Sequence, residues 1–397
     1  MGQNKNLVPM SSPDLEASDI EAVLSTLKTN YLSIGPKIIA FEDMFCTFTG
    51  AKHAIGVNSG TAGLHLCIRA AGIEQGDYVI TTPFSFVSST NVILFEKAIP
   101  IFVDIDKQTG NIDAEQVAQA ARDIQLGNPE KAQRWMPRQG DGKTGHLKSI
   151  LPVDVFGQPA DFNKLREVAA SHELTLIEDS CEALGAMYED QPAGMLGDFG
   201  VFAFYPNKQI TTGEGGMIVT NNDQFAERMR ALRNQGRAPG DTWLQHTYLG
   251  YNYRLDEMSA ALGISQMERV EQLLQKRQQV ADWYNTKLSA IKGIETPYIT
   301  PATTRMSWFV YVIRLDPALD RDRTAEMLIS AGIPVRPYFL PIHLQPYIAK
   351  QFGYHEGDYP VTEDIGRRSL AVPFSGIMTE AQVDLVCETI QNTLPRV

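Results

Sequence analysis

The 397-residue sequence has only four cysteines, and no two of them form a Cys-x-x-Cys pair that could bind a metal. Cys46, Cys67 and Cys387 fall within apolar helical patterns, and Cys181 follows a predicted strand. The seven histidines form no HxxxH or HxH spacing. We therefore expect no metal site, and a reduced, cytoplasmic protein in which the cysteines are small core residues.

The sequence also lacks an excess of positive charge and any long apolar run. Its net charge of −12 argues against a general nucleic-acid binder. No stretch of about eighteen apolar residues could span a bilayer, and MGQNKNLVPM lacks the apolar core of a signal peptide. We expect neither a nucleic acid nor a membrane as partner, so an anionic substrate would need local cations or helix N-termini.

Short apolar runs do alternate with helical patterns through the first two thirds of the chain. The runs lie at 53–57, 78–82, 100–105, 149–156, 174–179, 201–205 and 217–220, with helical patterns such as 62–72 and 164–173 between several of them. Strands separated by helices predict an α/β fold with a mainly parallel, seven-stranded sheet covered by helices. The last two runs are too close together for a crossover helix, which predicts an antiparallel pair.

A second, smaller α/β domain is predicted at the C-terminus. A long helix over about 255–291, bent near Gln272, leads into it. Its further elements are a strand at 308–315, a helix at 322–331, a strand at 333–339 and a helix after Thr379. We place the large domain at residues 1–260 and the small domain at 261–397, with an inserted loop near 127–146 that is rich in glycine, proline and mixed charge.

The turn NSGTAG follows the strand that ends at Val57 and leads directly into a helix. Small residues let backbone amides approach a ligand closely, and a helix N-terminus favours an anion such as phosphate. The alternative is an ordinary capped turn with Ser59 or Thr61 as the N-cap. Neither a P-loop nor a GxGxxG pattern is present, so a nucleotide fold is not supported.

Two further groups stand at strand ends, where ligands bind in open α/β sheets. Asp179, in LIEDSCEALGA, could hold a protonated ring nitrogen, because a nearby anion favours the charged base. Metal ligation and a solvated strand end are the competing interpretations. Phe86, in TTPFSFVSSTN, could stack on a flat ring, or it could be a core phenylalanine.

Lys208 ends the apolar run in FAFYPNKQITTGEGG. Its side chain could snorkel to water, or its amine could be desolvated and used as a nucleophile. An anion cradle, a stacking aromatic, a carboxylate and a lysine converge on one edge of one sheet. Together they suit pyridoxal 5′-phosphate, bound through its aldehyde to Lys208 as a Schiff base.

With these residues the chain resembles the DegT/DnrJ/EryC1/StrS sugar aminotransferases, which are fold-type-I pyridoxal-phosphate enzymes. The resemblance extends over nearly the whole chain, from YLSIGPKIIAFEDMF through NSGTAGLHL, LPVDVFGQPADF, EDSCEALGA, NKQITTGEGG and GYNYRLDEMSAALGISQMERV to PIHLQPY. It implies that Lys208 forms the Schiff base, Asp179 binds the pyridine nitrogen and Phe86 stacks on the ring. It also implies phosphate binding by Gly60, Thr61 and Ala62, and by Asn252 of the partner subunit in a homodimer with shared active sites.

The chain departs from the family pattern at two positions. The family usually has a glutamine near the cofactor's 3-hydroxyl, where this chain has Glu182, and a carboxylate there adds charge. The family often has a serine that touches the phosphate, where this chain has Ala203. A related branch of 3-dehydratases replaces the lysine with histidine, and Lys208 argues against that branch.

The resemblance implies a ping-pong transfer of an amino group from L-glutamate to a nucleotide-linked 3- or 4-keto-(6-deoxy)hexose, for surface-polysaccharide or secondary-metabolite sugars. Tyr31, Ser33 and His343 would line the sugar site. Arg237 and Arg254 are candidate partners for a carboxylate or diphosphate, because guanidinium binds such groups in a bidentate manner. For each of these five residues, a structural salt bridge or a packing role is the alternative. A cyclitol, a keto-octulosonate or an aminohydroxybenzoate precursor is an alternative acceptor. A non-catalytic regulatory protein that binds the cofactor is the alternative from another class.

Overall fold

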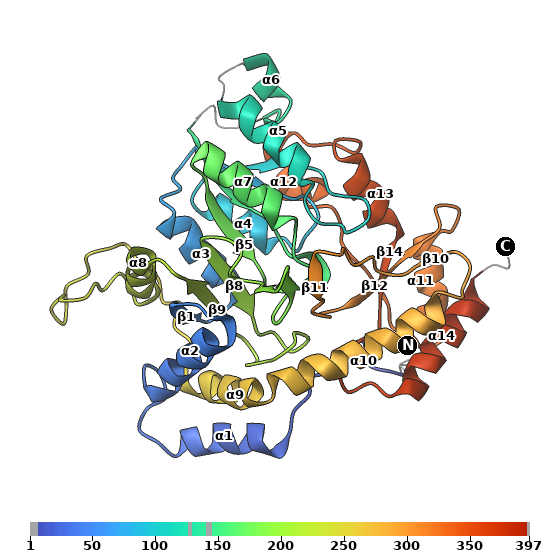
Figure 1. Cartoon of the computed structure of the whole chain (residues 1–397), viewed down its shortest axis with the longest axis horizontal. Coiled ribbons are helices and arrows are strands. Elements are labelled where there is room, and N and C mark those ends of the chain that lie inside the picture. The colour runs from blue at the N-terminus through green and yellow to red at the C-terminus, as the bar shows by residue number, and fades with distance from the viewer. Residues whose placement is uncertain (1–6, 126–128, 140–144, 395–397) are drawn as a thin grey trace.

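The large sheet has the seven strands and the mainly parallel order predicted from the sequence (Figure 1). The computed structural model describes residues 7–125, 129–139 and 145–394. Its strands, in the order β1-β9-β8-β5-β4-β2-β3, are β1 (His53–Val57), β9 (Gly216–Thr220), β8 (Phe199–Ala203), β5 (Thr175–Asp179), β4 (Leu147–Leu151), β2 (Tyr78–Thr81) and β3 (Ile99–Phe102). Only β9 runs antiparallel to its neighbours, which confirms the antiparallel pair.

Helices cover both faces of this sheet because its strands are apolar on both sides. On β9, Ile218 packs into the core under α3 and α8, whereas Met217 and Val219 pack with α2 on the opposite face. The first face is covered by α3 (Gly60–Ala70), α4 (Ser88–Phe95) and α8 (Asp223–Arg233), and the second by α2 (Pro36–Thr49), α5 (Ala114–Gln125) and α7 (Phe162–His172). Because the strands other than β9 run parallel, their carboxyl ends lie at one edge of the sheet.

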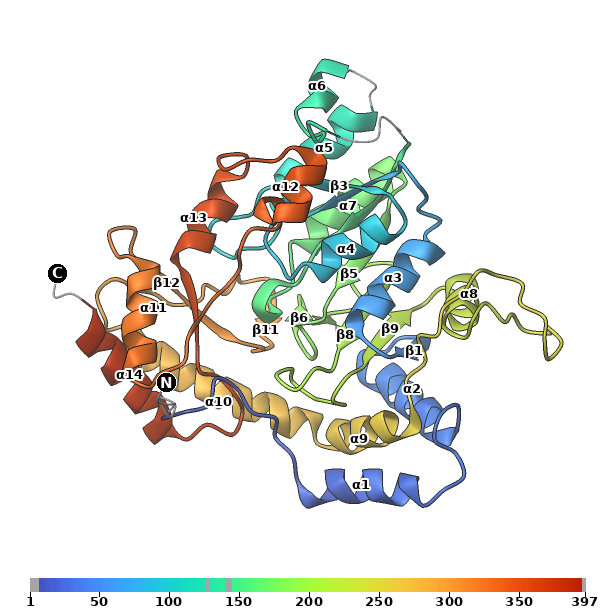
Figure 2. The same ribbon diagram turned by 180° about the vertical axis from the view of Figure 1, so that it is seen from behind.

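The predicted long helix is two helices that run along one side of the molecule (Figure 2). These are α9 (Glu257–Glu268) and α10 (Val270–Leu288), and α1 (Ala17–Leu27) packs on α9. The break falls at Arg269, three residues before the predicted bend, where φ is −122°. The guanidinium of Arg269 pairs there with Asp14 and Asp19, which ties the N-terminal segment to the break.

A four-stranded antiparallel sheet forms the centre of the C-terminal part. Its order is β10 (Ile294–Glu295), β12 (Tyr311–Leu315), β14 (Ser369–Val372) and β13 (Arg336–Pro337), and α10, α11 (Arg321–Ser330) and α14 (Glu380–Thr393) enclose its core. The remaining elements are α12 (Pro346–Phe352), α13 (Pro360–Arg368), the 3-10 turns at Val155–Gly157 and Ile342–Leu344, and a small sheet of β11 (Thr303–Arg305), β6 (Met187–Tyr188) and β7 (Gln191–Pro192). The domain boundary at residue 260 stays a prediction.

The predicted insertion at 127–146 lies partly outside the described residues. Its described part contains α6 (Pro129–Gln133) and Trp135, whose indole is buried and donates a hydrogen bond to Asp123 at 2.9 Å. Trp135 therefore holds this segment against α5. Within the described ranges, no helix is long and apolar enough to cross a membrane.

Candidate active site

The turn after β1 presents unpaired backbone amides at the carboxyl edge of the large sheet. Ser59 is the N-cap of α3, and its hydroxyl accepts a hydrogen bond from the Ala62 amide at 3.0 Å. Among the described residues nothing accepts a hydrogen bond from the amides of Gly60 or Thr61. The Thr61 hydroxyl donates to Ser88 at the start of α4. These two N–H groups at a helix N-terminus are suited to bind an anion.

Only glycine fits at the first position of α3. A Cβ on Gly60 would lie 2.8 Å from the Cβ of Ala203 and 2.8 Å from the Sγ of Cys181. A serine in place of Ala203 would have to turn its hydroxyl away from this contact. The close approach of α3 to β8 thus accounts for a small residue at position 203 and brings the cradle next to the end of β8.

Asp179 is a buried carboxylate whose partners in the described chain are all neutral. Its side chain accepts hydrogen bonds from the Ser89 hydroxyl at 2.7 Å and the Cys181 amide at 3.2 Å. No lysine, arginine or histidine of the described chain forms an ion pair with it, although its exposed fraction is only 4%. Because a buried charge without a counter-charge is costly, a cationic ligand would stabilise this carboxylate.

Lys208 lies in the loop after β8, with its side chain largely buried. Its Nζ is 3.8 Å from a carboxylate oxygen of Glu182 and 3.7 Å from the centre of the Phe309 ring. The second Glu182 oxygen accepts the Phe156 amide at 2.8 Å, which fixes the carboxylate in place. Burial raises the pKa of Glu182, and the Lys208 charge offsets part of that rise. The amine is therefore held inside the protein and does not snorkel to water.

Arg277, which the motif analysis did not single out, holds the Lys208 backbone. Its buried guanidinium extends from α10 and donates to the carbonyl oxygens of Asn207, Lys208, Trp308 and Phe309. These four bonds join the lysine loop to the segment between β11 and β12 that carries the Phe309 ring. The sequence signal was available, since Leu273, Arg277 and Val280 place a lone arginine on an apolar helix face.

Phe86 lies in the loop between β2 and α4 and is 63% exposed, whereas Phe84, two residues earlier, is fully buried. The interpretation of Phe86 as a core residue is therefore wrong. An exposed aromatic ring on the loop that leads into α4, whose first residues are Ser88 and Ser89, is available to stack on a flat ligand.

Two further carboxyls near Asp179, those of Asp154 and Glu178, are completely buried. The Ser180 hydroxyl lies 2.8 Å from Asp154 and 2.9 Å from Glu178, and Glu178 also accepts the amides of Gly194 and Leu196. Burial raises the pKa of both carboxyls, and the neighbouring Glu178 raises that of Asp154 further. The pair therefore retains a proton that two separate carboxyls would lose, and it anchors the end of β5.

We expect the variant Asp154→Asn to remove a pH dependence of folding stability. In the unfolded chain Asp154 loses its proton near its ordinary pKa of about 3.9. In the folded wild type it keeps the proton, so stability falls as pH rises between these two pKa values. The loss there is about 1.4 kcal/mol per pH unit. Asp154 and Glu178 also share a side-chain hydrogen bond, which an asparagine can donate without titrating. In urea denaturation from pH 5 to 9, the free energy of unfolding of the variant should increase relative to that of wild type as the pH rises.

Asp256→Asn is the matched control for this experiment, because Asp256 is the N-cap of α9 and asparagine caps a helix equally well. Stability curves of wild type and Asp154→Asn that stay parallel across the pH range would contradict the shared proton.

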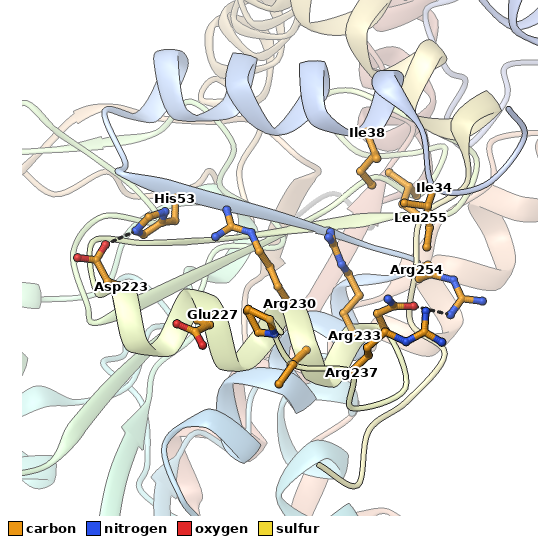
Figure 3. A pocket seen from close by; sticks show the side chains of 14 residues that line it. Ile34, Ile38, His53, Asp223, Glu227, Arg230, Arg233, Arg237, Arg254 and Leu255 are labelled. Atoms are coloured by element: carbon orange, nitrogen blue, oxygen red, sulfur yellow. Dashed lines mark hydrogen bonds and ion pairs between the residues drawn. The ribbon is translucent and has the colours of Figure 1, made fainter. Parts of the chain in front are cut away.

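Four arginines gather around a separate pocket between α2 and α8, which we call the arginine pocket (Figure 3). Its volume is about 560 Å³, and its arginines are Arg230, Arg233, Arg237 and Arg254. Arg233 is paired with Glu42, but no described carboxylate lies within ion-pair distance of the other three. The Nε atom of Arg237 is buried and has no hydrogen-bond partner in the part of the chain that the structure describes. The pocket is thus a local cationic site on a chain of net charge −12.

The remaining predicted site residues lie on segments other than the lysine loop. Tyr31 and Ser33 are exposed in the loop between α1 and α2, beside Ile34 of the arginine pocket. Asn252 is exposed, and Asn58 lies 3.4 Å from its carbonyl oxygen. His343 is fully buried, with Nε2 3.0 Å from Glu363. A sugar-binding role for Tyr31, Ser33 and His343, and phosphate binding by Asn252 of the partner subunit, stay predictions.

The residues at the sheet edge fit a cofactor with a phosphate at one end and a protonatable ring at the other. The amides at the start of α3 suit the phosphate, Asp179 lacks a cation, and Lys208 presents a desolvated amine. The seven-stranded sheet with its single antiparallel strand and the smaller C-terminal sheet are the fold of type I pyridoxal-phosphate transferases. Fold and site together therefore define a pyridoxal-phosphate enzyme.

Comparison with known proteins gives the family. The model of the DegT/DnrJ/EryC1/StrS aminotransferase family matches residues 13–391. GDP-perosamine synthase of Caulobacter vibrioides is 35% identical, with 98% of each chain covered, and the putative pyridoxal phosphate-dependent aminotransferase EpsN of Bacillus subtilis is 31% identical, with 96% of this chain and 94% of EpsN covered. The crystal structure of S. venezuelae DesV superposes with a TM-score of 0.86 at 29% identity, over 99% of this chain and 100% of DesV.

The chain belongs to the DegT/DnrJ/EryC1/StrS aminotransferase family, the sugar aminotransferases that depend on pyridoxal phosphate. The resemblance read from the motifs is confirmed, as are the fold, the cofactor and the enzymatic class. The interpretation as a non-catalytic regulatory protein is not supported by this membership.

Proposed function

We propose that the enzyme moves an amino group from L-glutamate to a keto sugar carried on a nucleotide, most directly a 3- or 4-keto-6-deoxyhexose. The observation that carries the proposal is the desolvated amine of Lys208 at the sheet edge, between Glu182 and Phe309. When bound, pyridoxal phosphate supplies the aldehyde that takes up the amino group and the ring that stores the electron pair. The protein supplies binding, orientation and proton transfer.

Each residue at the edge has a distinct task in this proposal. The Lys208 amine moves a proton to and from the substrate carbon, and Asp179 holds the protonated ring nitrogen. The free amides of Gly60 and Thr61 bind the phosphate, the Ala62 amide holds the Ser59 side chain beside them, and Phe86 covers one face of the ring. Glu182 lies where the family's glutamine stands and keeps the Lys208 amine oriented toward the cofactor.

A homodimer with shared active sites is part of the proposal. The segment between α8 and α9 stands out from the body of the subunit (Figure 1), and it carries Trp243, Leu244 and Leu249 with exposed fractions of 78%, 82% and 80%. Apolar side chains exposed to this extent favour burial by a second chain. The same segment continues into Asn252, so its docking would bring Asn252 of the partner subunit toward the phosphate.

The arginine pocket supports a nucleotide-linked acceptor over an uncharged cyclitol. A diphosphate carries two to three negative charges, and the pocket offers Arg230, Arg237 and Arg254, none of which forms an ion pair with a described carboxylate. Its four arginines outnumber the two acidic side chains in its lining, Asp223 and Glu227. Its volume of about 560 Å³ lies in the range of small-molecule sites. The relative named GDP-perosamine synthase also makes GDP-linked sugars the first acceptors to test.

Initial-rate kinetics with purified enzyme test the proposal. The amino group leaves the first substrate before the second one binds, so double-reciprocal plots at several glutamate concentrations should be parallel. Acceptors should be compared as a panel of nucleotide-linked keto sugars, a free keto sugar, a keto-cyclitol and a keto-octulosonate. Intersecting lines would contradict the two-stage scheme, and equal rates with free and nucleotide-linked sugars would contradict the assignment of the acceptor.

A further inference from the structure

A buried histidine on α3 links the phosphate-binding turn to two other segments. His65 is 3% exposed and lies on the second turn of α3, after the free amides of Gly60 and Thr61. Its Nε2 atom is 2.7 Å from a carboxylate oxygen of Glu96 at the end of α4, and its Nδ1 atom is 3.1 Å from the Tyr253 hydroxyl. Because α3 packs against both α4 and α8 (Figure 2), His65 reaches from its own helix to the segment that follows α8.

The partners of His65 determine which ring nitrogen carries the proton. A carboxylate only accepts, so the Nε2–H group donates to Glu96, and Nδ1 accepts from the Tyr253 hydroxyl. Burial lowers the pKa of His65, so the imidazole is neutral at pH 7. Burial alone would raise the pKa of Glu96, but hydrogen bonds from His65 and Arg69 hold it below its usual range. The ionised Glu96 also accepts the Tyr251 hydroxyl at 3.2 Å, so both tyrosines are tied to this His65–Glu96 pair.

Tyr251 and Tyr253 lie on either side of Asn252 in an extended segment. Side chains alternate in such a segment, so the tyrosines point to one side and Asn252 to the other. The two tyrosine rings stack at 4.9 Å with 10° between their planes and pack against the core under α3 and α8, whereas Asn252 is exposed. The backbone amides of the tyrosines donate to Leu232 and Arg233 at the end of α8. The segment is therefore anchored on the side opposite to Asn252.

We propose that His65 is a positioning residue for the active site of the partner subunit. By holding Tyr251 and Tyr253 it fixes the direction of Asn252, whose side chain then binds the cofactor phosphate of the other subunit. The inference rests on the homodimer with shared active sites in the proposed function. One helix thus serves both sites, because the first amides of α3 bind the phosphate of their own subunit and His65 orients a ligand for that of the partner.

A route within one subunit is the alternative. The Tyr253 carbonyl oxygen accepts the Asn58 amide at 2.9 Å, and Asn58 leads directly into the turn before Gly60. Loss of His65 could therefore disturb the amides of its own subunit instead of Asn252. The two routes differ in which of the two cofactor sites is weakened. A dimer made of two different subunits distinguishes them.

The test uses dimers in which only one chain can bind the cofactor covalently. One chain keeps Lys208, the other carries Lys208→Arg, and two different affinity tags isolate the mixed dimer. The dimer is freed of cofactor, titrated with pyridoxal phosphate and reduced with borohydride. Mass spectrometry then gives the labelled fraction of the Lys208 chain. In the proposed dimer, the labelled site combines Lys208 of one chain with Asn252 of the other.

The position of His65→Leu in the mixed dimer should decide its effect. On the Lys208→Arg chain, it should raise the pyridoxal phosphate concentration for half-labelling about 10-fold, the effect of one lost hydrogen bond to a charged group. On the Lys208 chain, it should leave half-labelling within about twofold of the unsubstituted mixed dimer. Added to Asn252→Ala on the Lys208→Arg chain, it should cause no further loss, because both substitutions remove the same contact.

A second variant tests the same contact with a smaller change in packing. Tyr253→Phe removes only the hydroxyl that His65 binds, and it should show the same dependence on which chain carries it, with an effect of about threefold. Tyr188→Phe is the matched control, because the Tyr188 hydroxyl donates to Asp161 at 2.9 Å in the core under α5 and α7. It should leave half-labelling unchanged on either chain.

The outcomes separate this inference from the shared site on which it rests. Weak labelling only with His65→Leu on the Lys208 chain, equal weakening on either chain, or no weakening on either chain overturns the inference. If Asn252→Ala on the Lys208→Arg chain has no effect, the shared phosphate site is wrong and the inference falls with it. Amino transfer from glutamate stands or falls separately, on the initial-rate kinetics.

Discussion

Replacement of Lys208 by arginine should lower kcat for amino transfer by about 10⁴-fold or more, because a proton-transfer group contributes about 10²- to 10⁴-fold and the covalent step is lost with it. A guanidinium stays protonated at every accessible pH, so it can neither attack an aldehyde nor take a proton from the substrate carbon. It does keep the positive charge beside Glu182 and the cation–aromatic contact with Phe309. The variant is therefore expected to fold with the stability of wild type.

Three measurements check this expectation. Turnover with glutamate and a keto sugar gives the rate, and thermal unfolding shows whether the fold is retained. Borohydride reduction of the holoenzyme followed by peptide mass mapping should attach the cofactor to residue 208 in wild type and leave it unattached in Lys208→Arg. Lys287→Arg is the control, because Lys287 on α10 forms an exposed ion pair. A Lys208→Arg enzyme within tenfold of wild-type turnover would show that another group carries the proton.

The large sheet could be predicted from the sequence because its strands are apolar on both faces and short. The run at 53–57 coincides with β1, and the other six runs overlap their strands within a few residues. The break between α9 and α10 was placed three residues late, because Arg269 is helix-compatible in itself. Its ion pairs with Asp14 and Asp19, about 250 residues away in the sequence, coincide with the break, and no local pattern reveals them.

The candidate site, like the fold, could be predicted from the sequence only in part. Asp179 and Lys208 could be expected to approach one another, because parallel strands end at one edge of a sheet. Arg277, Phe309 and Ser89 complete their surroundings, yet each comes from an element whose own pattern describes only packing or a turn. Contacts between distant segments depend on how the C-terminal sheet docks on the large sheet, which the order of motifs does not specify.

Substitution of Asp179 by asparagine should lower kcat/KM by about 10²- to 4 × 10³-fold, the second largest effect expected. Asparagine has the same shape and can still accept the Ser89 hydroxyl or the Cys181 amide, but it carries no charge to balance a protonated ring. Removing one partner of a buried ion pair costs about 3–5 kcal/mol, and each 1.4 kcal/mol corresponds to a factor of ten in rate. Steady-state kinetics with glutamate and the keto sugar give the ratio.

A cofactor analogue methylated on the ring nitrogen tests whether charge or shape explains the loss. Its positive charge is fixed, so it does not need a carboxylate to stay cationic. We therefore expect it to restore more activity to Asp179→Ala, which has room for the methyl group, than to wild type, where the methyl group clashes with the Asp179 side chain. Asp320→Asn, an exposed N-cap on α11, controls for the loss of one charge. If the analogue restores no activity to Asp179→Ala, Asp179 acts through the packing of β5 and the Ser89 hydrogen bond. The cation that balances the buried carboxylate would then be a group other than the ring nitrogen.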